Sequence, residues 1–351
     1  MKRNQLENKM KKEHYIYIDI LNLFACISVI YMHCNGIVHS YENTRAWKES
    51  MIIETICYWA VPVFFMISGA TLLDYRDKYS TKTYFEKRIL KTVLPFIFWC
   101  IFNLGFKMLF LKMPFDWNIS SVISIFNNAA SENVYWFFMP LFAVYLSIPV
   151  ISLLRKNKTV LSYMAVISFL VYSVYPSFCM LFKVTRNTDL IFPVSGGYLI
   201  YVILGYIFSK SELNTTIRLF IYFLGLIGVI VRYGTTVWMS VKQGSLYTGF
   251  WGYINFPAVF LAIAVFVAIK YIPWERFIKS AKLKHIIATL SGASFGVYLI
   301  HMIIYRILQS VTGIDSHSFI WRLIMPVIIY AVCVIIVTVM KKIPVVKYIV
   351  P

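Results

Sequence analysis

Charged residues are scarce in this sequence, and acidic residues are the scarcest. Of its 351 residues, 14% are charged and 15 are Asp or Glu, whereas 60% are hydrophobic. The mean hydropathy is +0.71. A soluble domain of this length needs a polar and charged surface that this composition does not supply. The sequence therefore excludes a soluble globular protein and predicts an all-α protein that crosses a membrane several times.

Motifs for metal and phosphate binding are also missing. The six cysteines are scattered, without a CxxC pair and without histidines at the spacing of a metal site. The sequence contains no glycine-rich phosphate loop, no HExxH and no GxSxG. We therefore expect no bound metal, no disulfide framework and no lipase-like serine nucleophile.

The formal net charge of +19 does not predict nucleic acid binding in a chain this apolar. Basic residues between hydrophobic segments set the orientation of a membrane protein and contact anionic lipid head groups. A lipid bilayer, and not a nucleic acid, is the partner that this charge predicts.

The apolar runs predict a transmembrane helical bundle of about ten spans, because roughly 20 apolar residues cross the hydrocarbon region. The spans lie near 15–35, 51–73, 92–111, 135–154, 159–176, 196–209, 217–238, 253–271, 291–309 and 321–340. The sixth is short for a span. Lys and Arg concentrate on the side of the amino terminus, so both termini are expected in the cytoplasm. We predict a basic cytoplasmic segment at 1–14, one membrane domain at 15–340 and a short cytoplasmic tail at 341–351.

The first span is unusually polar for a membrane helix. Asp19, Asn22, Cys26 and His33 fall on one stripe at about 100° per residue. A polar side chain at membrane depth usually faces a bundle interior or a wet cavity, and it is a functional candidate. A buried imidazole tends to be neutral, which suits a general base or an acyl carrier. A hydrogen bond between helices is the alternative for His33.

Two later spans contain further candidates. His301 in the ninth span extends the polar interior, although a hydrogen bond between helices explains it equally well, and Arg306 follows toward the outer half. Ser68 and Gly69 end the apolar run of the second span, where small residues usually serve helix packing.

Two loops between spans are distinctive. The cytoplasmic loop 74–91 is rich in Lys and Arg and includes Lys87, Arg88 and Lys91. Such a loop sets topology or docks an anionic cytoplasmic ligand. The outer segment 112–134 is moderately apolar and predicts an amphipathic surface helix.

Six segments, in this order, resemble the integral-membrane acyltransferases of the acyltransferase type 3 group, which O-acetylate bacterial envelope components. The segments are YIDILNLFACISVIYMH, VPVFFMISGATLL, YFEKRILKTVLPFIFW, YWFFMPLFAVYLSIPVI, GYLIYVILGYIF and SFGVYLIHMII. Together they span nearly the whole chain. The fourth looks like the family's Trp-Phe helix, and the sixth resembles its Tyr-Leu-x-His helix.

The resemblance implies transfer of an acyl group, most often acetyl, from cytoplasmic acetyl-CoA to a hydroxyl of an envelope glycan or lipid-linked saccharide. It implies a multi-pass location in the bacterial cytoplasmic membrane. His33 would be the essential histidine, with Asp19 and His301 in the catalytic region. Positions expected at the donor are Asn22, Ser68, Lys87, Arg88 and Lys91, and positions expected at the acceptor are Trp136, Tyr145 and Tyr298.

One position departs from the family pattern. The family places an arginine ten intervening residues before its histidine, and this chain has Asn22 there. An amide forms hydrogen bonds but supplies no fixed charge. A non-catalytic membrane sensor is therefore one alternative. The other is a transporter that uses intramembrane His and Asp, although no inverted repeat is visible.

Overall fold

The computed structural model describes residues 16–351, and within this range the chain is helical, without strands. The predicted all-α fold is therefore confirmed. The helices are α2 (Ile16–His33), α3 (Arg45–Cys57), α4 (Ala60–Leu72), α5 (Thr81–Arg88), α6 (Leu94–Phe110), α7 (Ile119–Asn127), α8 (Phe138–Ile151), α9 (Lys158–Phe169), α10 (Tyr175–Leu181), α11 (Leu199–Lys210), α12 (Thr215–Gln243), α13 (Phe256–Tyr271), α14 (Trp274–Phe277), α15 (Ala281–Thr312), α16 (Phe319–Leu323) and α17 (Met325–Met340).

Seven helical stretches within residues 16–351 are long and apolar enough to cross a membrane. They are Ile16–His33, Arg45–Asp77, Thr81–Phe110, Asn133–Leu154, Lys158–Leu181, Thr215–Gln243 and Ala281–Thr312. Three shorter apolar helices, α11, α13 and α17, accompany them. Large apolar side chains such as Phe110 and Trp238 are mostly exposed on the outside of the bundle. Exposed apolar surface of this kind suits a protein surrounded by lipid.

Some helices extend well beyond the apolar runs that predicted them. α15 begins at Ala281, ten residues before the predicted span, because the Ser280 hydroxyl accepts a hydrogen bond from the Leu283 amide and caps the helix. It ends at Gly313, whose φ of +61° is the usual helix stop. The helix therefore extends beyond the predicted span at its N-terminal end, and His301 lies about 30 Å along it from Ala281.

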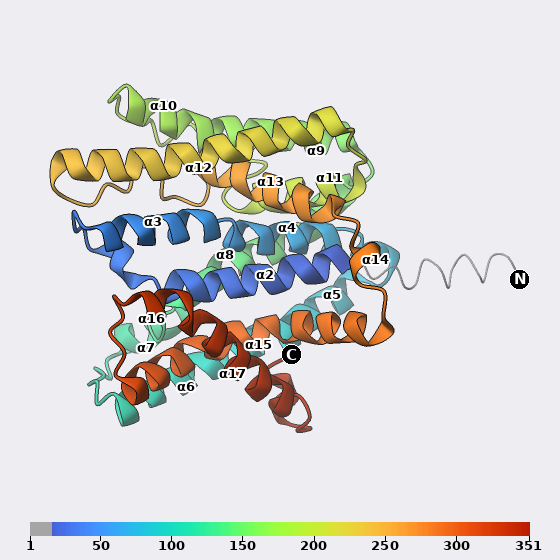
Figure 1. The fold of residues 1–351 in the computed structure, drawn as a ribbon. Coiled ribbons are helices and arrows are strands. Elements are labelled where there is room, and N and C mark those ends of the chain that lie inside the picture. The colour runs from blue at the N-terminus through green and yellow to red at the C-terminus, as the bar shows by residue number, and fades with distance from the viewer. Residues whose placement is uncertain (1–15) are drawn as a thin grey trace, which may run out of the picture.

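Two large apolar clusters lie in the described part of the bundle, and α2 contributes to both. One cluster joins α2 to α4, α8, α11 and α13, and the other joins it to α6, α15 and α17. In Figure 1, α9, α10, α12 and α13 lie on one side of the blue α2–α4 layer, and α15, α16 and α17 lie on the other. α2 therefore has the central place that its polar stripe requires.

α4 and α11 approach each other at backbone distance. A Cβ added at Gly69 would lie 1.9 Å from the Val202 carbonyl oxygen, and one at Gly205 would lie 2.1 Å from the Met66 carbonyl oxygen. Only glycine permits this contact, as in other close helix pairs in membranes. The structure thus explains Gly69 by packing.

Two helical stretches contain a π-turn. Ile89–Val93 joins α5 to α6, and Leu170–Val174 joins α9 to α10. Each π-turn is followed by a proline, Pro95 or Pro176, at the start of the next helix. Proline has no N–H for the helical hydrogen bond and its ring crowds the preceding turn, so a local change of winding accommodates it.

The outer segment and the tail are both ordered. Within 112–134, α7 buries Ile125 and exposes Ile119, as expected for an amphipathic helix. In the tail, Val350 is fully buried, and the Trp99 indole donates a hydrogen bond to the Ile349 carbonyl at 2.7 Å. The end of the chain therefore packs into the bundle against α6.

Candidate functional site

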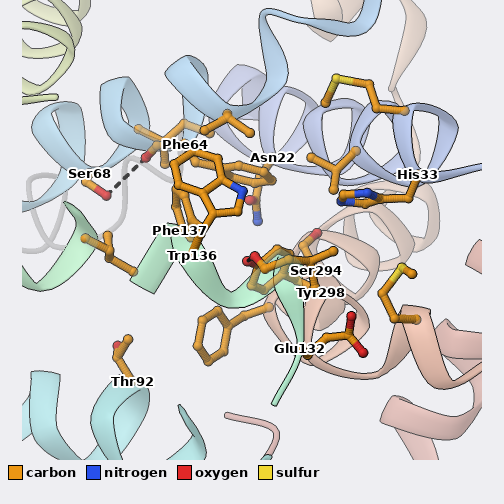
Figure 2. Close-up of a pocket in the computed structure, with 18 of the residues that line it drawn as sticks. Asn22, His33, Phe64, Ser68, Thr92, Glu132, Trp136, Phe137, Ser294 and Tyr298 are labelled. Carbon is orange, nitrogen blue, oxygen red and sulfur yellow. Dashed lines mark hydrogen bonds between the residues drawn. The ribbon is translucent and has the colours of Figure 1, made fainter. Parts of the chain in front are cut away.

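A large cavity with a volume of about 1310 Å³ is lined by residues of both apolar clusters. Nine of the residues that the sequence predicted for the site line it, namely Asp19, Asn22, His33, Ser68, Arg88, Lys91, Trp136, Tyr145 and Tyr298. Figure 2 shows Asn22 and His33 from α2, Trp136 from the segment before α8 and Tyr298 from α15 around the same space. The polar stripe of α2 therefore faces a cavity, as expected from its composition.

His33 and His301 form a pair at one end of this cavity. Their ring centroids lie 5.2 Å apart with an interplanar angle of 33°. His301 is buried, and its Nδ1 lies 2.6 Å from the Tyr298 carbonyl oxygen. Because a carbonyl only accepts, Nδ1 carries the proton, and in the neutral ring Nε2 keeps a lone pair. That Nε2 is buried and has no hydrogen-bond partner among the described residues.

His33 itself is only partly buried and lines the cavity, whereas His301 lies behind it. No hydrogen bond joins the His33 ring to another group within residues 16–351. Its nitrogens are thus open to a molecule in the cavity. A neutral imidazole in this position is suited to accept a proton from a hydroxyl.

A charged cluster lies near the histidine pair. Arg306 donates two hydrogen bonds to the Glu132 carboxylate, at 2.5 and 3.0 Å, and Lys107 lies 3.8 Å from the same carboxylate. Glu132 is buried, so the fork of Arg306 satisfies a charge that would otherwise be costly. Arg306 was noted in the sequence, but Glu132 and Lys107 were missed. Their signal was weak, because both lie at the edges of apolar runs.

The other end of the cavity is basic. Arg88, Lys91 and Lys341 line it, and Lys341 donates a hydrogen bond to the Gly292 carbonyl at 2.6 Å. The Nε of Arg88 is buried without a partner among the described residues. Burial, together with the neighbouring charge of Lys91, lowers the pKa of Lys341. An anion bound among these groups would relieve both effects.

Lys87 is placed differently from its neighbours. Its ammonium lies 3.8 Å from the centre of the Tyr79 ring, a cation–π contact, and it does not line the cavity. Contact of Lys87 with a donor therefore remains a prediction, and it would have to occur outside this cavity.

Asn22 joins α2 to α15 near the basic end. Its amide nitrogen donates to the Ser291 carbonyl at 2.8 Å and lies 3.1 Å from the Ser291 hydroxyl. Ser291 adjoins Gly292, the partner of Lys341, so Asn22 and Lys341 lie at one level of the bundle. A hydrogen-bonded amide thus occupies the position where the family that the sequence resembles has an arginine. The nearby cations come from other helices.

The remaining predicted residues have defined partners. The Ser68 hydroxyl donates to the Phe64 carbonyl at 3.0 Å, which is the usual bond of a serine to its own helix. The Tyr298 hydroxyl donates to the Val134 carbonyl. The ring of Tyr145 lies below the Arg88 guanidinium, 5.3 Å from its carbon. Tyr298 and Tyr145 therefore shape the wall, and the Ser68 hydroxyl bonds to its own helix.

Glu54 and Arg232 are buried charged residues that sequence reasoning missed. Glu54 lines the cavity. The guanidinium of Arg232, in α12, lies 4.0 Å from the Glu54 carboxylate. Arg232 also donates to the Phe250 carbonyl at 2.8 Å. The available signal was Arg232 itself, which lies deep within the apolar run 217–238, because an intramembrane charge is rarely without a partner.

No group of three or more His, Cys, Asp or Glu within residues 16–351 could hold a metal ion. The groups that could hold an anionic cofactor are the three cations at the basic end. The arrangement suits a reaction in which an anionic donor enters at one end and a proton is taken up by His33 at the other.

Comparison with known proteins gives one match. A family model described as an acyltransferase domain matches residues 15–341, nearly the whole chain. No curated protein and no solved structure matches the chain.

Proposed function

This chain belongs to the acyltransferase family, and from that premise we propose that it is a membrane-bound O-acyltransferase of the bacterial cytoplasmic membrane. It moves an acyl group, acetyl in the first instance, from cytoplasmic acetyl-CoA to a hydroxyl of an envelope glycan or lipid-linked saccharide. The observation that carries this proposal is one cavity that has both a basic end and a histidine end.

The donor is proposed to bind at the basic end. Coenzyme A carries several phosphate charges, and Arg88, Lys91 and Lys341 are the cations that line the cavity there. Arginine in particular matches phosphate geometry with its planar fork. The acyl-bearing arm would pass Asp19 and Asn22 to reach His33, about 16 Å farther along α2 than Asn22.

His33 is proposed to act as general base. Its unprotonated ring nitrogen takes the proton of the acceptor hydroxyl while the hydroxyl oxygen attacks the thioester carbonyl. The tetrahedral intermediate then expels the coenzyme A thiolate, which receives the proton from His33. His301 lies behind His33 and would fix its orientation. In the alternative with a covalent step, the His33 ring nitrogen attacks the thioester carbonyl and expels the coenzyme A thiolate. The acceptor hydroxyl then attacks the acyl-imidazole and takes the acyl group, His33 is released, and the hydroxyl proton passes to the thiolate.

An assay with radiolabelled acetyl-CoA tests the proposal directly. The protein is reconstituted in proteoliposomes with an envelope extract as acceptor, and the label is followed into glycan or lipid-linked material. We expect transfer that depends on the protein. Absence of both binding and consumption of the donor would contradict the proposal and would favour a transporter. Binding without turnover would favour a sensor.

Neutralising the basic end should weaken donor binding selectively. In Arg88→Gln and Lys91→Gln we expect KM for acetyl-CoA to rise about tenfold, because each removes one charge from a site for a polyanion. The ratio of KM in each variant to KM in the parent protein should be smaller at high salt, since added ions screen the attraction between the cations and the donor. Initial rates at varied donor concentration measure both effects.

Lys82→Gln is the matched control, because Lys82 is an exposed lysine of the same basic stretch and does not line the cavity. An equal rise of KM in Lys82→Gln would show that the charge acts through the general surface potential. The proposed donor site would then be wrong.

A further inference from the structure

Four side chains form a continuous stack that ends in the cavity. The Arg232 guanidinium carbon lies 3.3 Å from the centre of the Tyr58 ring. Tyr58 stacks on Tyr253 at 4.2 Å with an angle of 7°, and Tyr253 stacks on Trp136 at 5.5 Å with an angle of 19°. The Tyr58 hydroxyl donates a hydrogen bond to the Trp251 carbonyl. Each ring is thus fixed by its neighbours.

Trp136 is the end of this stack. Tyr58 lies between Arg232 and Tyr253, and Tyr253 lies between Tyr58 and Trp136. Among the described residues, Trp136 stacks on Tyr253, meets Tyr198 at an angle of 44° with centroids 6.1 Å apart, and is 37% exposed. Trp136 lines the cavity and lies near its centre in Figure 2. The stack therefore presents one rigid aromatic face to the cavity. A rigid face binds a flat ligand with little loss of conformational entropy.

Glu54 supplies hydrogen-bond acceptors on the same wall. It lies one helical turn before Tyr58, is only 6% exposed and lines the cavity. Arg232, its nearest cation, is 4.0 Å away, which is beyond a hydrogen bond. No described group donates a hydrogen bond to the Glu54 carboxylate. A buried carboxyl group whose oxygens accept no hydrogen bond from the described residues is suited to hydroxyl donors.

We propose that this wall is the acceptor subsite and that it binds a neutral saccharide. The weakly positive C–H groups on one face of a sugar ring lie on the negative face of Trp136. A further sugar unit in the same cavity reaches past the edge of the stack, where its hydroxyls donate to Glu54. This inference rests on the proposed function, which requires a saccharide acceptor in the cavity. It adds the residues that bind this acceptor. It also separates acceptor from donor, because the cations of the donor end lie on other helices.

Saccharide binding can be measured without any acyl transfer. The full chain in nanodiscs is mixed with methyl β-cellobioside or methyl β-chitobioside, and saturation-transfer NMR follows the sugar protons. We expect transfer concentrated on the protons of one ring face. In Trp136→Leu we expect binding about tenfold weaker or lost, and in Glu54→Gln several-fold weaker binding.

Two variants control this experiment. Trp117→Leu removes a tryptophan that is 67% exposed and lies outside the cavity, and it should bind like the parent protein. Trp136→Phe keeps an aromatic face and should retain most of the binding. This second result separates stacking from a folding defect.

Three outcomes would overturn the inference. They are binding of neither glycoside, equal binding by Trp136→Leu and the parent, and displacement of the sugar by free coenzyme A. Failure of the proposed function is a different result. It is seen as saccharide binding that depends on Trp136 in a protein that transfers no acyl group.

Discussion

Replacing His33 with alanine is expected to lower the rate of acyl transfer by about 10²- to 10⁴-fold, the range that a positioned general base contributes. His33 is the histidine of the pair that lines the cavity, and no described group occupies its ring nitrogens. Because the ring does not line the basic end, KM for acetyl-CoA should change much less than kcat. Rates of labelled acetyl transfer in proteoliposomes measure both constants.

The control for this prediction is His317→Ala, which removes an exposed histidine after α15 that does not line the cavity. It should transfer at the parent rate. Thermal unfolding of both variants in the same detergent shows whether the bundle is intact. Undiminished transfer by a folded His33→Ala protein would remove the histidine from the mechanism.

Replacing Gly205 with alanine is expected to destabilise the fold severely, by about 3 kcal/mol or more. The added Cβ would lie 2.1 Å from the Met66 carbonyl oxygen and 2.4 Å from the Met66 Cα. These are backbone atoms, so no rotamer change relieves the clash, and α4 and α11 must separate. Thermal unfolding in detergent, together with the yield of folded protein, measures the loss.

Gly105→Ala is the matched control, because Gly105 lies within α6 and a Cβ there meets nothing within 4 Å. Alanine favours the helix by about 1 kcal/mol at such a site, so unfolding should occur at an equal or higher temperature. Equal stability of Gly205→Ala and Gly105→Ala would show that α4 and α11 are not packed at backbone distance.

The apolar runs predicted the helices because burial in lipid requires long hydrophobic segments. Their ends were less predictable, since a helix continues through polar residues until a capping group stops it. Lys282 and His285 precede the apolar run 291–309, yet the Ser280 cap lets α15 include both. Hydropathy alone does not register a hydrogen bond between a serine and an amide three residues later.

The cavity face of α2 was predictable because a helical period relates Asp19, Asn22 and His33. The pairing of His33 with His301 was not, since the two lie on different helices and their relative depth depended on where α15 begins. The contacts of Glu132 and Glu54 could not be predicted from the sequence either. Local patterns within a helix repeat in sequence, whereas contacts between helices far apart in the chain leave no period to read.

The position of Asn22 illustrates the same limit. The sequence shows a missing charge at this position, but it does not show that an amide there binds the Ser291 carbonyl and holds two helices together. Nor does it show that Lys341, from the end of the chain, lies at the same level. Compensation among distant residues needs three-dimensional positions.

The π-turn at Ile89–Val93 affects how this chain is to be aligned with others. A π-turn amounts to one extra residue within a helix, and deleting one residue rotates everything before it by about 100° about the axis. Arg88 precedes the turn, whereas the cavity-lining part of α6 follows it. In a homologue without the π-turn, the cation equivalent to Arg88 would lie one position away in a sequence alignment. A residue-by-residue comparison would then count a preserved charge as a substitution.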